Sequence, residues 1–262
     1  MMAQLEVKGV TFAYDHDKTI LKDINISLND GELVCLLGVS GGGKTTLFNV
    51  IAGLLRPQEG QVLLNGEDIT GQSGRISYML QKDMLLSYRT VEDNVALPLI
   101  IKGVGKKEAR MTAGKYFEQF GIEGTQKKYP AELSGGMRQR AALLRTYLFS
   151  SDVALLDEPF SALDTLTKSE MHRWYLEVMD NIKMSTIFIT HDVDEAILLS
   201  DRIYLLGQRP GVITDEIVIG EPKPRRGDFA LSEEFLRYKR EIISKIREVP
   251  RGKTAYDGRI LQ

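Results

Sequence analysis

Apolar residues along the chain follow two different periods, and each period predicts a different type of element. Short segments rich in β-branched and aromatic residues, bounded by turn-forming residues, are typical of strands. Strands are therefore expected at residues 5–14, 21–28, 32–37, 61–65, 75–81, 152–157, 185–190, 201–207 and 212–219. Longer segments with apolar residues on one helical face predict helices at residues 44–54, 90–103, 106–121, 135–149, 166–182, from 193, and at 232–248.

The order of these elements predicts an α/β fold with two additions. The N-terminal part is rich in strands, with Asn29-Asp30-Gly31 forming a tight turn before residues 32–37. Only helices are expected between about residues 84 and 150, which we interpret as an inserted helical lobe. Strands and helices then alternate again to residue 220. We therefore expect a main domain over residues 1–220, and a linker with a C-terminal helix over 221–262.

Composition narrows the class of protein. The chain has 34 basic and 36 acidic residues, a net charge of −2, so charge gives no reason to expect nucleic acid or an anionic membrane as partner. The single cysteine, Cys35, lies in an apolar strand and is expected to be a buried, inert thiol in a reducing cytoplasm. No segment approaches the roughly 18 apolar residues that a membrane span requires. Any membrane association is expected to occur through a partner.

A glycine-rich loop, GVSGGGKTT, directly follows the strand at 32–37 and precedes the predicted helix at 44–54. It matches the pattern G-x-x-x-x-G-K-[ST] in the strand-to-helix context that this pattern requires. The backbone N–H groups of such a loop surround a polyphosphate, and the lysine adds a positive charge at the β- and γ-phosphates. The predicted nucleotide-binding residues here are Gly38, Ser40, Gly41, Gly42, Gly43, Lys44, Thr45 and Thr46, with the Thr45 hydroxyl also on Mg²⁺.

Two adjacent acids follow the apolar strand at 152–157. Asp157 ends this strand, where side chains emerge at the sheet edge, and it is the expected carboxylate at Mg²⁺. Glu158 is expected to act as the general base that polarises the attacking water. The alternative is a pair of solvated acids that end a strand without binding anything.

With these residues in place, the chain resembles the ATP-binding subunits of ABC transporters over residues 4–220. Leu133-Ser134-Gly135-Gly136-Met137 is similar to the LSGGQ signature of that family, with Met137 in place of glutamine. Gln81 resembles the Q-loop glutamine, Asp164 belongs to a segment similar to the D-loop, and His191 resembles the histidine at the γ-phosphate. The resemblance implies the ABC ATPase fold, with a P-loop NTPase core, an antiparallel β subdomain and the helical lobe.

The resemblance also implies roles for these residues. It places Glu158, His191, Gln81 and Lys44 in catalysis, Gln81 at Mg²⁺, and Ser134, Gly135, Gly136 and Asp164 at the nucleotide. Tyr14, at the end of a strand, resembles the aromatic residue that stacks on adenine, although a tyrosine buried in the core or simply exposed on a strand is the alternative. His16 and His172 are expected to be structural, and Met79 and Trp174 to belong to the core.

The signature segment implies a second copy of the chain. Ser134, Gly135 and Gly136 precede a predicted helix, which gives an anion-binding helix start, yet the chain has one complete glycine loop. A twofold dimer, in which each signature closes on the nucleotide of the other copy, accounts for this, as in the family. The alternative is a helix cap of small residues.

The membrane partner is also implied by the resemblance. The family couples to separate permease subunits at a groove beside the Q-loop, where Met84, Leu85, Leu86 and Tyr88 would line the groove or pack internally. The chain most resembles the nitrate, sulfonate and taurine importer branch, which also includes importers of pyrimidine precursors of thiamine. It would then act at the cytoplasmic face of the membrane, with an extracytoplasmic solute-binding protein as an indirect partner. A soluble ABC ATPase without a transport role and a nucleotide-gated scaffold are the alternatives.

The segment GEPKPRRGDF is expected to be a solvated linker without an assigned function, although a turn at Arg209-Pro210-Gly211 and Pro224-Arg225-Arg226 also resemble the importer branch. Lys223, Arg225 and Arg226 are accordingly expected to be hydrated.

Overall fold

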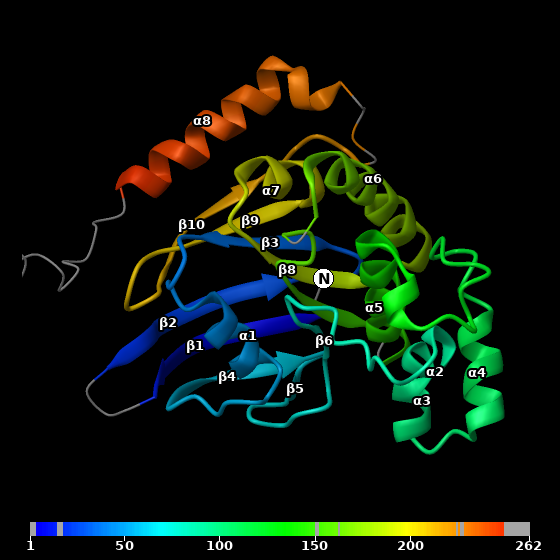
Figure 1. The fold of residues 1–262 in the computed structure, drawn as a ribbon. Coiled ribbons are helices and arrows are strands. Elements are labelled where there is room, and N and C mark those ends of the chain that lie inside the picture. The colour runs from blue at the N-terminus through cyan, green and yellow to red at the C-terminus, as the bar shows by residue number, and fades with distance from the viewer. Residues whose placement is uncertain are drawn as a thin grey trace, which may run out of the picture.

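Two β-sheets and the helices around them form the fold (Figure 1). The structure, a computed structural model, describes residues 4–14, 18–149, 152–161, 163–223, 225 and 228–248. The first sheet has four strands in the order β2-β1-β4-β5. Its strands are β1 (Leu5–Ala13), β2 (Thr19–Leu28), β4 (Glu59–Leu64) and β5 (Glu67–Asp68). They pair antiparallel, which confirms the predicted antiparallel β subdomain.

The second sheet has six strands in the order β10-β9-β3-β8-β7-β6. These are β3 (Leu33–Gly38), β6 (Ser77–Met79), β7 (Val153–Asp157), β8 (Ser185–Thr190), β9 (Arg202–Leu206) and β10 (Ile213–Val218). All pairings are parallel except that of β10 with β9. The carboxyl ends of the parallel strands therefore meet at one edge, which we call the carboxyl edge, and their amino ends meet at the opposite amino edge.

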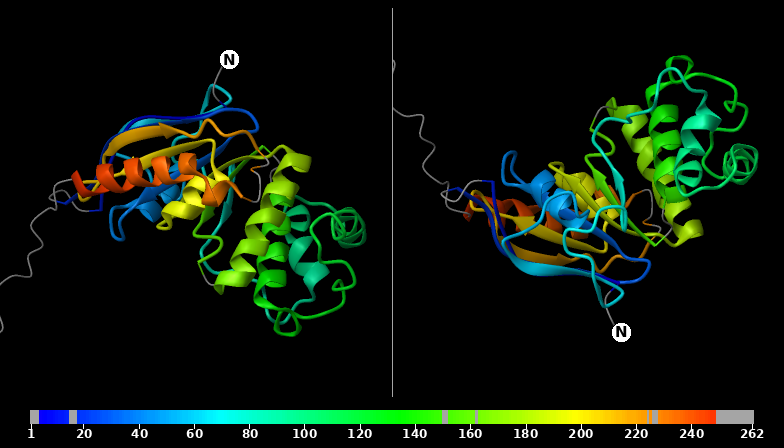
Figure 2. Two further views of the ribbon diagram at one scale, coloured as in Figure 1. Left: turned by 90° about the horizontal axis from the view of Figure 1, so that it is seen from above. Right: turned by 90° about the horizontal axis from the view of Figure 1, so that it is seen from below.

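The helices fall into groups (Figures 1 and 2). They are α1 (Lys44–Ile51), α2 (Val91–Val95), α3 (Leu97–Ile101), α4 (Lys106–Gly114), α5 (Gly135–Phe149), α6 (Thr165–Ile182), α7 (Val193–Leu199) and α8 (Glu233–Glu248). Figure 2 shows α2, α3, α4 and α5 standing to one side of the sheets, where the helical lobe was expected. Helix α8 lies across α7 and β10, and no described helix is long and apolar enough to span a bilayer.

Strand β3 separates two hydrophobic cores. Leu33, Cys35 and Leu37 belong to the core shared with α5, α7 and α8, whereas Val34 and Leu36 belong to the core between the two sheets, around α1. This division follows from the period of two along a strand, which turns successive side chains to opposite faces. Because both faces are covered, the strand is apolar throughout, as is usual in a parallel sheet.

Two sequence-based expectations about helices need correction. The helix expected over 106–121 ends at Gly114, and the next residues form turns in which Tyr116 N donates to Ala113 O (3.1 Å). The helix expected over 90–103 is divided into α2 and α3, with Pro98, which lacks an N–H, in the first turn of α3. The expected turn at Asn29–Gly31 is confirmed, and it leads from β2 in one sheet to β3 in the other.

The expectation of a fully solvated linker was wrong for two of its basic residues. Lys223 pairs with Asp201 (2.6 Å), and the Arg225 guanidinium donates to the carbonyls of Leu198 and Ser200 at the end of α7. Burial lowers the pKa of Arg225 to about 10. Both side chains are bound by residues of distant segments, and the composition of the linker could not predict these contacts. His16, Pro224 and Arg226 lie outside the described residues.

Candidate nucleotide-binding site

The glycine loop lies at the carboxyl edge, between β3 and α1. Two of its glycines, Gly41 (φ +79°) and Gly43 (φ +103°), adopt the left-handed conformation that glycine tolerates best. The Lys44 ammonium is folded back into the loop, donating to the carbonyls of Gly38 (2.8 Å) and Val39 (3.0 Å). Burial lowers the pKa of Lys44, against the opposing effect of the nearby carboxylates. The loop thus holds a partly desolvated cation that an anion would stabilise.

A hydroxyl and a carboxylate meet at the start of α1. Thr45 Oγ1 donates to Asp157 Oδ2 (2.9 Å), and burial raises the pKa of Asp157. These are oxygen donors at the phosphate-binding loop, the type of ligand that Mg²⁺ prefers, so the residues fit the predicted ion. Gln81, the other predicted metal-side residue, donates its amide nitrogen to Glu158 instead (3.0 Å), and its carbonyl oxygen would be the atom available to a cation.

Glu158 lies between the side chains of two residues that follow neighbouring strands. Its Oε2 accepts from Gln81 Nε2 (3.0 Å), and its Oε1 lies 3.2 Å from His191 Nδ1. Gln81 follows β6, Glu158 follows β7 and His191 follows β8, so the parallel sheet brings all three together. Glu158 has φ +46°, an uncommon conformation for a residue with a side chain. The Glu158 carboxylate thus lies at the carboxyl edge, in the wall of a cavity that the glycine loop also lines.

Two neighbouring cavities surround these groups. The first, of about 250 Å³, is lined by glycine-loop residues, Tyr14, Asp157 and Glu158. The second, of about 740 Å³, is lined by Gln81, Gly135, Glu158 and His191 among others. Glu158 belongs to both. The predicted catalytic and phosphate-binding residues therefore face one continuous region of the surface.

Tyr14 is exposed, which excludes the core alternative. Its side chain is 59% accessible, its ring packs edge-on against Phe12, and its hydroxyl lies 3.4 Å from Thr46 Oγ1. The ring lines the same cavity as the glycine loop. It is therefore available to a flat ligand group above the loop.

The signature residues are arranged differently from the glycine loop. Ser134 Oγ accepts from Met137 N (3.3 Å) at the start of α5, and Asp164 caps α6 by accepting from Thr167 N (3.1 Å). Gly135 lines the larger cavity, whereas Ser134, Gly136 and Asp164 are not among the described residues that line either one. Within one chain, the signature thus remains apart from the glycine-loop cavity.

Sequence reasoning missed one charged residue of the smaller cavity. Arg209, which follows β9, lines it together with the glycine loop. Its position after a parallel strand is the signal that could have identified it, because Gln81, Asp157 and His191 share that placement.

A third cavity, of about 440 Å³, lies beside the Q-loop and is largely apolar. Its lining includes Leu54, Met84, Leu97, Ile101 and Phe149. We call it the lobe groove. The sequence left open whether Met84, Leu85 and Tyr88 line a groove or pack internally. Met84 lines the lobe groove, Leu85 packs against the core, and Tyr88 is exposed outside the groove.

Comparisons with known proteins agree with this geometry. The sequence profile of the family described as ABC transporter matches residues 21–161. The formylaminopyrimidine import ATP-binding protein ThiZ of Halalkalibacterium halodurans is 42% identical over 206 residues, covering 79% of this chain and 80% of the relative. The nitrate import ATP-binding protein NrtD of Synechocystis sp. is 39% identical over 233 residues, covering 87% of this chain and 88% of the relative.

A solved structure extends the comparison to the fold. The dimeric structure of a post-hydrolysis state of the ATP-binding cassette MJ0796, bound to ADP and Pi, has a TM-score of 0.69 and 27% identity, covering 82% of this chain and 98% of that chain. The fold is therefore that of an ABC ATPase. Together with the relatives, this result shows that the chain belongs to the ABC transporter ATP-binding family, whose members are ATPases coupled to transport.

Proposed function

We propose that this chain is the ATP-hydrolysing subunit of an importer for a small solute, with Glu158 as the general base. The observation that carries the proposal is the Glu158 carboxylate, held by Gln81 and His191 and lining both cavities. The relatives supply the direction and class of transport, since they are named for the import of nitrate and of formylaminopyrimidine.

ATP would bind with its phosphates in the glycine loop. The Lys44 ammonium would exchange its bonds to the Gly38 and Val39 carbonyls for bonds to phosphate oxygens, which stabilise its charge better. Thr45 and Asp157 would hold Mg²⁺, which neutralises charge on the phosphates. Tyr14 would stack on the adenine, because its exposed ring lines the same cavity.

Hydrolysis requires a water aligned with the γ-phosphate. Glu158 would accept a proton from that water, while Gln81 and His191 keep the carboxylate in place. His191 is 58% accessible at its side chain, so it is also free to contact the γ-phosphate directly.

The proposal includes a twofold dimer. The signature and the glycine loop of one chain lie apart, so Ser134, Gly135 and Gly136 of a second copy would complete the site, with Asp164 at the same interface. The related cassette MJ0796 is a dimer in its ADP- and Pi-bound structure, which supports this arrangement. Loss of the γ-phosphate would then weaken the dimer and couple hydrolysis to opening.

The lobe groove would receive the membrane subunits. Its lining of Leu54, Met84 and Ile101 offers exposed apolar area next to the Q-loop, where a helix could dock. The chain would thus work at the cytoplasmic face of the membrane, and the solute-binding protein would contact it only indirectly. Co-purification with permease subunits in detergent is expected, and recovery of the chain alone under those conditions would contradict this part.

The division of the chain belongs to the same proposal. Residues 1–220 would form the ATPase unit, including the helical lobe at about 84–150, and the segment from residue 221 would add α8 to its surface. The lobe helices stand apart from the sheets, which supports this division (Figure 2).

Replacing Glu158 tests the proposal. Glu158→Gln removes the proton acceptor while keeping the shape, so Mg²⁺-dependent phosphate release should fall by about 10² to 10⁴. ATP binding should persist, and the variant should accumulate as a dimer, measured by light scattering at saturating ATP. Glu118→Gln, which neutralises an exposed carboxylate of the lobe, is the matched control and should behave as the wild type. A Glu158→Gln protein that remains monomeric with ATP, or hydrolyses it at the wild-type rate, would refute the assignment.

A further inference from the structure

The turn after β9 is fixed against the glycine loop. β9 runs parallel to β3, and Leu206 is the pairing partner of Gly38. A Cβ at Gly38 would lie 2.6 Å from the Leu206 carbonyl oxygen, and a Cβ at Gly211 would lie 2.5 Å from the Gly42 carbonyl oxygen. Backbone packs directly on backbone at both ends of the turn, so glycine is required there and the turn has little freedom to move.

The same turn is also bonded to β2. Gly211 N donates to Ile20 O (2.7 Å), and Lys22 N donates to Gly211 O (2.9 Å). The turn thus connects the four-stranded sheet, which carries Tyr14, with the glycine loop of the six-stranded sheet. The backbone at its centre is therefore held at the wall of the smaller cavity.

That side chain is Arg209. Its Nε donates to Gly41 O (2.9 Å), which orients the guanidinium over the glycine loop, and Arg209 lines the smaller cavity with Lys44 and Thr45. A guanidinium carries five N–H donors, so the four on its Nη atoms remain for a ligand. Arg209 is exposed, and no carboxylate of the described residues pairs with it. Within the described part of the chain, Arg209 is thus a cation without an ion-pair partner, beside the glycine loop.

We propose that Arg209 binds the phosphate chain of the nucleotide, as a second cation besides Lys44. The inference rests on the proposed function, since it requires a nucleotide in this cavity. The cavity also contains the carboxylates of Asp157 and Glu158, so a cationic side chain in addition to Lys44 would favour a polyphosphate there. A planar guanidinium suits phosphate because it presents parallel N–H donors to two oxygens.

ADP binding measured by calorimetry tests the role. Arg209→Gln should weaken ADP binding by about tenfold, the usual loss for a hydrogen bond to a charged group. Arg209→Lys, which keeps the charge without the planar fork, should show a smaller loss. The loss for Arg209→Gln should shrink between about 50 and 300 mM NaCl, because salt screens an exposed charge. Melting temperatures without nucleotide should stay close to that of the wild type.

The controls separate the possible failures. Arg240→Gln removes an equal charge from the exposed face of α8 and should leave ADP affinity unchanged. Equal ADP affinity in wild type and Arg209→Gln overturns the inference alone. A loss that is the same at both salt concentrations also overturns it, since that result indicates a loop contact or stacking on the base. If the wild type itself fails to bind ADP, the proposed function fails first.

Discussion

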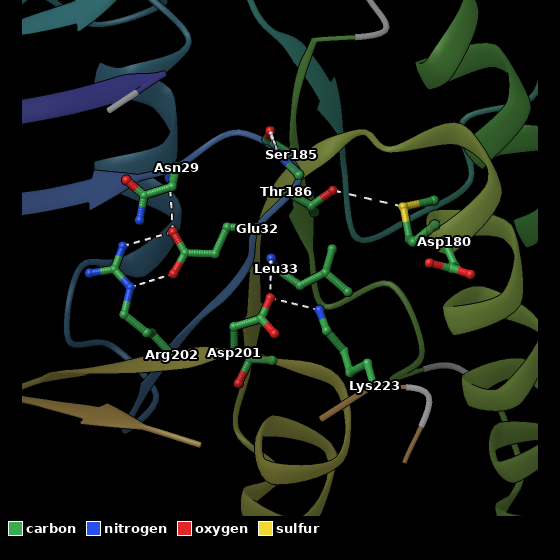
Figure 3. A network of polar contacts seen from close by, with 12 residues as sticks. Asn29, Glu32, Leu33, Asp180, Ser185, Thr186, Asp201, Arg202 and Lys223 are labelled. Carbon is green, nitrogen blue, oxygen red and sulfur yellow. Dashed lines mark hydrogen bonds and ion pairs between the residues drawn. The ribbon is translucent and has the colours of Figure 1, made fainter. Parts of the chain in front are cut away.

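The two edges of the six-stranded sheet carry charged residues in very different settings. At the amino edge, Glu32 faces Arg202, and Asp201 lies between the Leu33 N–H and the Lys223 ammonium (Figure 3). At the carboxyl edge, the Glu158 carboxylate lies beside Gln81 and His191, and Lys44 bonds to backbone carbonyls. The same strands thus end in a closed ionic network on one side and in open charges on the other.

Arg202 shows how complete the amino edge is. Its guanidinium pairs with both oxygens of Glu32 and donates to Glu216 Oε1 (2.8 Å), to the Tyr204 hydroxyl (2.9 Å) and to Ser27 O (2.8 Å). The side chains of Arg202 and Glu32 are 13% and 11% accessible. Because the donors are used within the chain, this edge stabilises the fold and offers little to a ligand.

The contrast between the two edges distinguishes charged residues that stabilise the fold from charged residues that are available to a ligand. A buried ion needs compensation, and at the amino edge the chain provides it. At the carboxyl edge, Lys44 and Arg209 bond to backbone carbonyls and Asp157 bonds to a hydroxyl, so these charges have no closely paired counter-ion among the described residues. Perturbed pKa values of Lys44 and Asp157 follow from this incomplete compensation, as is common at functional sites.

Arg202→Met should remove the central ion pairs of the amino edge and should have the largest effect on stability of the substitutions proposed here. Removing one partner of a buried pair leaves Glu32 uncompensated, at a cost of about 3 to 5 kcal/mol of unfolding free energy. Denaturant unfolding measures this cost, and ATPase activity at low temperature should remain near that of the wild type. Arg75→Met, which breaks an exposed pair with Glu67, should cost far less, because water already solvates both charges. If both variants lost the same unfolding free energy, the conclusion that the amino edge stabilises the fold would be contradicted.

Tyr14→Ala should affect the carboxyl edge alone. If the exposed ring stacks on adenine, its truncation should weaken ATP binding by about 1 to 3 kcal/mol, by analogy with base stacking on aromatic residues. Tyr14→Phe should bind as the wild type does, because the hydroxyl makes only a long contact of 3.4 Å with Thr46. Fluorescence titration with labelled ATP measures all three proteins, and equal affinities would reject stacking.

Asp157→Asn should show the smallest effect and the opposite sign, a gain in stability. Burial raises the pKa of Asp157 in the folded protein above its unfolded value, so ionisation increasingly opposes folding as the pH rises from the unfolded value through the folded one. Without nucleotide and Mg²⁺, the variant should be more stable than the wild type at pH 7, by about 1 kcal/mol. The difference should shrink as the pH falls toward the unfolded value near 4. Urea unfolding at several pH values measures it, and a difference that grows in acid would contradict this account.

Local patterns in the sequence predicted most of the elements and the residues at the carboxyl edge. Gly38, Gln81, Asp157 and His191 were identifiable because each lies at or just after the end of an apolar strand, and parallel strands end together. The dimer, the groove partner and the residue roles remain predictions, because they depend on groups that one chain does not contain.

Contacts between distant segments were harder to predict. Lys223 and Arg225 belong to a polar, proline-containing segment, whose composition indicates hydration, yet Asp201 and the last carbonyls of α7 hold them. Arg209 was missed for the same reason, since its contact with Gly41 joins residues 168 positions apart. Helix lengths were overestimated where a glycine or proline interrupts an otherwise apolar pattern, as at Gly114 and Pro98.

The alternation of β3 between two cores limits how this chain can vary in length. Inserting one residue into Leu33–Gly38 would exchange the sides of all later side chains, placing Cys35 and Leu37 where Val34 and Leu36 now pack. It would also move Gly38 away from the Leu206 carbonyl, where a side chain does not fit. The alternation of side chains along β3 and the position at which the glycine loop begins are therefore fixed together. Insertions should be tolerated only outside Leu33–Gly38.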